Sequence, residues 1–179
     1  LIVVDSQWYL ENWDQQPNMN EDCDIKTRED FFDELRGEIN KNQNRIVVLA
    51  LHHPVYSTGN HGGYFSLQDH LYPFEKKIPL PVLGSLINYT RAVSGINTQD
   101  LQSKKYNALN KRLQTMAQMY NNVVLVSGHE RNMQYHEKEG VKQNVSGALG
   151  DLSPARAIEK GSFSAGQLGY AALEIGVDK

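Results

Sequence analysis

The chain has 179 residues, of which 40% are hydrophobic and 22% charged, which is typical of a globular domain with a sizeable core. A formal net charge of −3 gives no reason to expect a nucleic-acid partner. No apolar run approaches the roughly 20 residues of a membrane span, and the single cysteine excludes an internal disulfide framework.

The first third of the chain predicts two strands around one helix. The apolar run Leu1–Val4 is typical of a buried strand. Since the chain begins within this run, we expect a piece of a longer protein. Thr27, with Asp30 three residues later, predicts the capped start of an amphipathic helix over 28–40. The continuous apolar run 45–51 predicts a strand covered on both faces.

Two stretches lack a regular apolar period. Residues 12–24 are rich in Asn, Asp and Gln and predict a surface loop. Residues 55–97 contain several glycines and prolines and predict a long inserted flap of irregular structure. Aromatic side chains are interleaved along this flap, which argues against disorder. We therefore expect the flap to be ordered and to fold over a site.

The second half continues the alternation of helix and strand. A helical apolar stripe covers 99–120, and a buried strand is predicted at 123–126. Residues 133–145 predict a hairpin that turns at Glu139-Gly140, and 170–175 predicts a closing strand. This order predicts a single layered α/β domain over residues 1–179.

Two of the predicted strands end in histidine. His52 and His53 follow the strand at 45–51, and His129 follows the strand at 123–126. Strands of one sheet that end at the same edge bring such imidazoles together, and imidazole is a common ligand of Zn, Fe and Mn. His61, in a glycine-rich turn of the flap, is a third candidate that can reach a substrate. The alternative is that His52 and His53 only cap a strand and that His61 is a turn residue.

The histidine loops also carry a resemblance. His52–Ser57, Asn60–Gly63 and Ser127–Tyr135 together resemble the second half of calcineurin-like metallophosphoesterases, in particular the purple-acid-phosphatase-like subgroup with its bacterial envelope members. The resemblance extends to about Gly147. It implies a four-layer αββα sandwich with a two-metal site at the strand ends, of which residues 1–179 are the C-terminal portion.

The resemblance implies a role for each candidate residue. His52 and His129 would ligate the same divalent or trivalent ion (Fe, Zn or Mn), and His61 would orient the substrate or protonate its leaving group. Apart from the resemblance, we expect His53 and Arg131 to bind a small phosphoester, since a guanidinium is a good phosphate clamp and can stand in for a missing cation. The further partners would be the rest of the domain or an envelope protein, in a periplasmic or outer-membrane setting.

The sequence departs from the family pattern in two places. The family has a second histidine two residues after the first, where this chain has Arg131, which cannot ligate a metal. The family's Asp-x-His, Gly-Asp-x-x-Asp and Gly-Asn-His-Asp motifs do not occur, so we expect them before Leu1. His52 and His129 alone are fewer than the three protein ligands of a strong site. By itself, this chain is therefore expected to hold one ion or none and to be inactive.

Two functions follow from these observations. The first is a metal-dependent phosphoesterase that hydrolyses a phosphomonoester with metal-activated hydroxide. The second is a catalytically inactive relative that keeps the fold as a binding or assembly subunit. In the second case the aromatic flap would be the contact surface, because aromatic side chains are favoured at interfaces.

Overall fold

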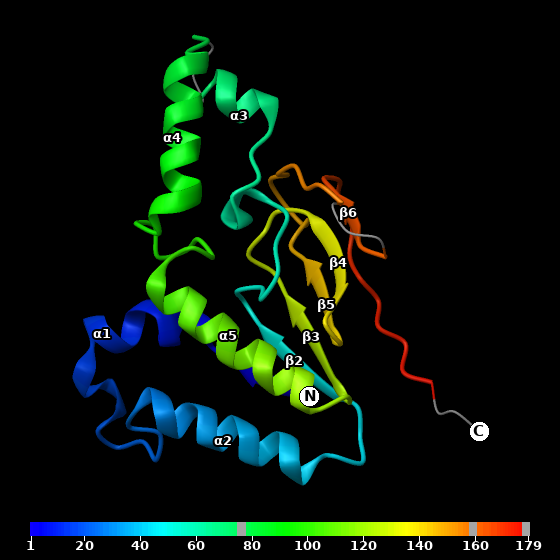
Figure 1. Ribbon diagram of the computed structural model, residues 1–179. Coiled ribbons are helices and arrows are strands. Elements are labelled where there is room, and N and C mark those ends of the chain that lie inside the picture. Colours follow the sequence, from blue (N-terminus) through cyan, green and yellow to red (C-terminus); the bar gives the residue numbers. More distant parts are fainter. Residues whose placement is uncertain (75–77, 158–160, 177–179) are drawn as a thin grey trace.

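A computed structural model describes residues 1–74, 78–157 and 161–176 and places a six-stranded mixed sheet at their centre (Figure 1). The strand order is β1-β2-β3-β5-β4-β6. The strands are β1 (Ile2–Val4), β2 (Val47–Leu51), β3 (Val123–Ser127), β4 (Met133–Lys138), β5 (Val141–Ser146) and β6 (Phe163–Ala165). The fold is therefore mixed α/β, as predicted.

The described residues form five α-helices: α1 (Trp13–Gln15), α2 (Arg28–Lys41), α3 (Leu67–Leu71), α4 (Pro81–Ser94) and α5 (Lys104–Met119). Short turns of other helix types occur at Trp8–Asn12, Pro17–Asn20 and Asn60–Gly62. None of the helices in this part of the chain is both long enough and apolar enough to cross a membrane.

Helices α2 and α5 cover one face of the sheet (Figure 1). Thr27 caps α2 as predicted, because its side chain accepts a hydrogen bond from the backbone N–H of Asp30. The apolar faces of both helices join one buried core with strand residues such as Leu49 and Leu125. These two residues are paired in register between β2 and β3, so the core fixes how the two histidine-bearing strands are aligned.

On the opposite face of the sheet, the part formed by β1, β2 and β3 is apolar but less covered. Val3, Ala50 and Val126 lie in one row across β1, β2 and β3. Val3 is 74% exposed, while Ala50 and Val126 are half-buried. The prediction that the strand at 45–51 is covered on both faces is therefore wrong for the described residues.

The prediction of irregular structure over 55–97 is wrong for much of this stretch, because it contains α3 and α4. In the sequence Pro81 and Gly84 suggested a loop, but both residues lie within α4. Proline is tolerated in the first turn, where its missing N–H leaves no bond unmade. At Gly84 an added Cβ would lie 2.1 Å from the carbonyl oxygen of His70. The glycine therefore allows α3 to approach α4 closely.

Three further predictions concern the hairpin at 133–145, the closing strand at 170–175 and the loop at 12–24. The hairpin of β4 and β5 turns at Glu139 and Gly140, which have φ values of 52° and 80° and match the predicted turn. Residues 170–175 do not form the closing strand that was predicted; among the described residues, β6 pairs with β4 instead. Residues 12–24 contain short helical turns rather than only loop.

Candidate functional site

The carboxyl ends of β2 and β3 bring His52 and His129 together. Leu51 and Ser127, the last residues of these strands, are paired in register. The N–H of Gly128 donates to the carbonyl oxygen of His52 across the strand ends, at 3.2 Å. His129 has a φ of 64°, an uncommon backbone conformation for a residue other than glycine, and one that clusters at functional sites.

The facing nitrogens of the two rings are Nδ1 of His129 and Nε2 of His52, which lie 3.1 Å apart. Nε2 of His129 lies 2.9 Å from the backbone carbonyl oxygen of Gln99. Since a carbonyl only accepts, Nε2 carries the proton and Nδ1 has the lone pair. His129 therefore directs a lone pair toward His52.

Burial keeps both imidazoles in the neutral form that binds metals. Burial, with a smaller contribution from the nearby His61, lowers the pKa of His129 to about 3. Burial also lowers the pKa of His52, again with a contribution from His61. A proton therefore competes weakly for either ring at neutral pH.

His53 lies beneath this pair and is fully buried. Its Nδ1 is 2.9 Å from the hydroxyl of Ser6, and its Nε2 is 2.8 Å from the side-chain oxygen of Gln99. Burial lowers the pKa of His53 to about 4. The structure thus places this predicted substrate-binding residue away from solvent, with both ring nitrogens engaged by protein groups.

His52, His53 and His129 form one cluster, which we call the three-histidine cluster. One ligand atom from each residue lies within 4.8 Å of the others, so the cluster could hold a metal ion. Nothing in this geometry selects one metal over another, because imidazole suits several transition metals.

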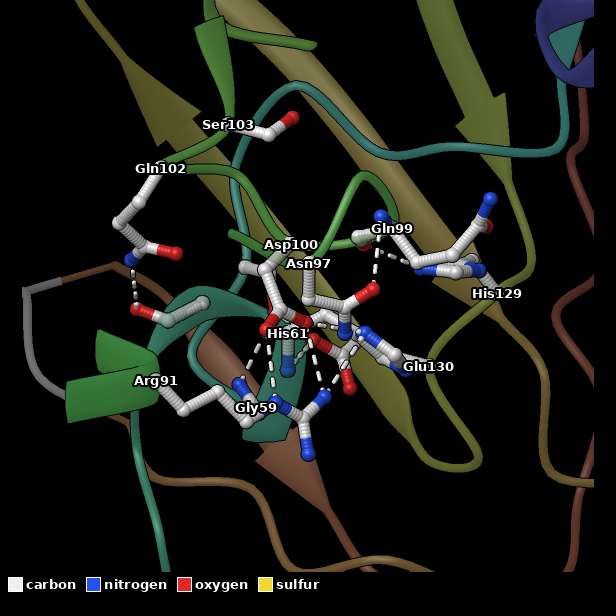
Figure 2. Close-up of polar contacts among 12 residues, drawn as sticks. Gly59, His61, Arg91, Asn97, Gln99, Asp100, Gln102, Ser103, His129 and Glu130 are labelled. Atoms are coloured by element: carbon white, nitrogen blue, oxygen red, sulfur yellow. Dashed lines mark hydrogen bonds and ion pairs between the residues drawn. The ribbon is translucent and has the colours of Figure 1, made fainter. Parts of the chain in front are cut away.

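The ring of the predicted catalytic residue His61 packs against that of His129, with centroids 4.0 Å apart and planes inclined by 37°. Its Nδ1 lies 2.7 Å from Oδ1 of Asp100, and Arg91 from α4 binds both oxygens of the same carboxylate, at 2.7 and 2.8 Å (Figure 2). Burial alone would raise the pKa of Asp100, but hydrogen bonds from Arg91 and His61 lower it to about 2. Asp100 is therefore ionised and fixes the orientation of the His61 ring.

A second buried carboxylate, Glu130, holds the loop that carries His61. It accepts hydrogen bonds from the hydroxyl of Ser57 and from the backbone N–H of His61, the latter at 3.1 Å. A Cβ on Gly59 would lie 2.4 Å from Oε2 of Glu130, so a larger residue there would have to displace this buried carboxylate. Burial raises the pKa of Glu130, and the Ser57 hydrogen bond opposes that effect.

Arg131 is the one predicted site residue that the structure places apart from the others. Its guanidinium pairs with Asp151 at 2.9 Å, and both side chains are largely exposed. The Arg131 side chain thus lies at the surface and contacts Asp151 rather than the three-histidine cluster.

Sequence reasoning missed Arg91, Gln99, Asp100 and Glu130 as parts of the site. Glu130 directly follows His129, so its position next to a strand-end histidine could have indicated that it belongs to the site. Arg91, Gln99 and Asp100 lie in or after the stretch interpreted as an irregular flap, and no spacing in the sequence connects them to His61 or His129. Only the packing of α4 brings Arg91 to the site.

Comparisons with known proteins show the fold and leave the family open. No family model matches the sequence, and no curated protein matches it. A solved structure described as "GAP50 the anchor in the inner membrane complex of Plasmodium" is similar, with a TM-score of 0.52 and 14% identity. The match covers 94% of this chain and 38% of that structure, so the chain spans well under half of its length.

Proposed function

We propose that this chain supplies the histidine loops of a calcineurin-like metallophosphoesterase and that the site hydrolyses a phosphomonoester with the help of a bound metal. One observation carries the proposal. Nδ1 of His129 directs its lone pair at Nε2 of His52, 3.1 Å away, while the Nε2 proton of His129 is held by the carbonyl of Gln99. A ligand histidine whose other nitrogen donates to a carbonyl is the usual arrangement in metal sites.

The spacing of the two nitrogens supports this assignment. Two nitrogens bound tetrahedrally at 2.0–2.1 Å from one ion are separated by about 3.3 Å, which is close to the 3.1 Å between His52 and His129. An Fe, Zn or Mn ion bound there would activate water and neutralise phosphoryl oxygens. His53 would support the two ligands from below, because both of its nitrogens are already engaged.

His61 is placed for proton transfer at the substrate. Asp100 holds its Nδ1 at 2.7 Å, so Nε2 is the ring atom available to exchange a proton. In the proposed reaction, His61 acts as an imidazolium whose Nδ1–H donates to Asp100; its Nε2–H passes a proton to the leaving oxygen of the phosphoester and leaves a neutral imidazole. The contact between the rings of His61 and His129 keeps this proton beside the proposed ligands.

The apolar, less covered face of the sheet supports the four-layer sandwich as part of the same proposal. Val3, Ala50 and Val126 offer a row of aliphatic side chains on the face opposite α2 and α5. Sheets that pack face to face bury rows of this kind. A second sheet from the rest of the domain would pack there.

A second candidate is a phosphoesterase-fold assembly subunit without activity. It is favoured by Arg131, which stands where the family pattern has a ligand and is engaged by Asp151 instead. The similar solved structure is described as an anchor, a role that needs no catalysis.

Turnover of p-nitrophenyl phosphate by the metal-stripped full-length protein, with Zn²⁺, Mn²⁺ or Fe³⁺ added back, distinguishes the two candidates. The phosphoesterase proposal predicts metal-dependent hydrolysis that His129→Ala abolishes and His61→Asn slows by about 10²-fold or more. His70→Asn is the matched control, because His70 lies in α3 and bonds Ser85. Absence of turnover with all three metals would favour the assembly subunit.

A further inference from the structure

Two neighbouring residues, Gln99 and Asp100, contact three of the histidines of the site. The backbone carbonyl oxygen of Gln99 lies 2.9 Å from Nε2 of His129, and its side-chain oxygen lies 2.8 Å from Nε2 of His53. Asp100 holds Nδ1 of His61 at 2.7 Å (Figure 2). The position of these two residues therefore decides how three imidazoles are oriented.

Glu11 attaches this part of the chain to the N-terminal region. It belongs to the short turn at Trp8–Asn12. Its Oε1 accepts hydrogen bonds from the hydroxyl of Thr98 and, at 2.8 Å, from the side-chain amide of Gln99. Its Oε2 accepts a hydrogen bond from the amide of Gln7, also at 2.8 Å. Both carboxylate oxygens are therefore engaged, and two of these three bonds hold the segment that contacts the histidines.

The direction of these bonds follows from the carboxylate. The hydrogen bonds from Thr98 and Gln99 lower the pKa of Glu11 and so favour its ionised form. An ionised carboxylate only accepts hydrogen bonds, so the amide nitrogen of Gln99 faces Glu11. The amide oxygen of Gln99 then faces His53, and its backbone carbonyl faces His129.

We propose that Glu11 is a positioning residue of the site. It holds Gln99 so that the backbone carbonyl keeps the proton of His129 on Nε2 and leaves the lone pair of Nδ1 for a metal ion. Groups that bond the second nitrogen of a ligand histidine commonly change metal affinity by about 10- to 100-fold, and Glu11 acts through such a group. The effect on metal affinity rests on the proposed function, whereas the position of the proton does not.

Nitrogen NMR of the imidazole rings in the zinc-free, full-length protein tests the position of the proton. We expect His129 to carry it on Nε2 in the wild type and in Glu11→Gln, because a glutamine oxygen can still accept from Thr98 and Gln99. Glu11→Ala removes both bonds, so the share of the Nδ1–H form should rise by about fivefold, as for the loss of one hydrogen bond. Glu21→Ala, at an exposed carboxylate of the same region, is the control. Circular dichroism of each variant verifies that the fold is kept.

Zinc binding to the same variants separates positioning from attraction by charge. If Glu11 positions Gln99, Glu11→Ala should weaken zinc binding by about tenfold or more, and Glu11→Gln should bind zinc within about threefold of the wild type. If the negative charge of Glu11 attracts the ion instead, both substitutions should weaken binding to the same extent.

Two results would overturn the proposal. The first is a proton position on His129 in Glu11→Ala that is the same as in the wild type. The second is zinc binding that Glu11→Gln weakens as much as Glu11→Ala does. A wild-type protein that binds no zinc would refute the proposed metal site alone, and the proton position in the zinc-free protein then decides the role of Glu11.

Discussion

Nδ1 of His61 lies 2.7 Å from Oδ1 of Asp100, and the same carboxylate is held by both Nε and Nη2 of Arg91. The pair joins two parts of the chain that are 39 residues apart. Since Arg91 belongs to α4, this helix helps to orient the ring proposed to exchange a proton with the substrate. The position of α4 and the orientation of the His61 ring are thus linked through the buried carboxylate of Asp100.

Asp100→Asn is expected to destabilise the protein by about 2 kcal/mol at pH 7, because the carboxyl pKa of about 2 in the fold lies below its unfolded value of about 3.9. This contribution is fully present above the unfolded pKa and is lost as the pH falls toward 2. Urea unfolding at pH 7 and at successively lower pH measures it. Asp151→Asn, at an exposed ion pair, should change stability by less than about 0.5 kcal/mol. Equal effects of the two substitutions would contradict the assignment.

Substitution of two helical glycines by alanine should have opposite effects. Gly37 in α2 has open space around its Cβ position, so Gly37→Ala should stabilise the protein by about 1 kcal/mol through helix propensity. At Gly84 the added Cβ meets the carbonyl oxygen of His70 at 2.1 Å. Gly84→Ala should therefore destabilise the protein by about 1 to 3 kcal/mol. Thermal unfolding measures both; stabilisation by Gly84→Ala would show that α3 does not pack as described.

Arg131→His should increase the metal bound per chain. The substitution removes a permanent charge and places an imidazole two residues after His129, where the resembling family has a ligand. Elemental analysis after equilibrium dialysis measures the change. Arg131→Gln is the control, because it removes the same charge without adding a ligand. An increase in both variants would point to repulsion by the guanidinium, and no change in either would refute the predicted gain.

Much of the sheet could be predicted from the sequence because its signals are local. The apolar runs that became β2 and β3 end directly in His52 and His129, and parallel pairing in register places both residues at one edge. Thr27 and Asp30 likewise predicted the start of α2 from their spacing alone. In these places short-range pattern and long-range packing agree.

The parts that could not be predicted depend on contacts between distant residues. Pro81 and Gly84 suggested a loop, yet α4 forms because Pro81 occupies its first turn and Gly84 faces the backbone of α3. The burial of His53 results from Ser6 and Gln99, which approach it from opposite ends of the chain's first hundred residues. Arg131 pairs at the surface with Asp151, which lies twenty residues later in the chain.

Zinc binding to the metal-stripped protein, measured by titration calorimetry, tests the central claim most directly. We expect one zinc ion to bind per chain, and we expect this binding to be lost in His52→Ala and in His129→Ala and kept in His70→Ala. The two loss variants remove the facing nitrogens at 3.1 Å, whereas His70 lies in α3. Zinc binding that is undiminished when both His52 and His129 are replaced would contradict it.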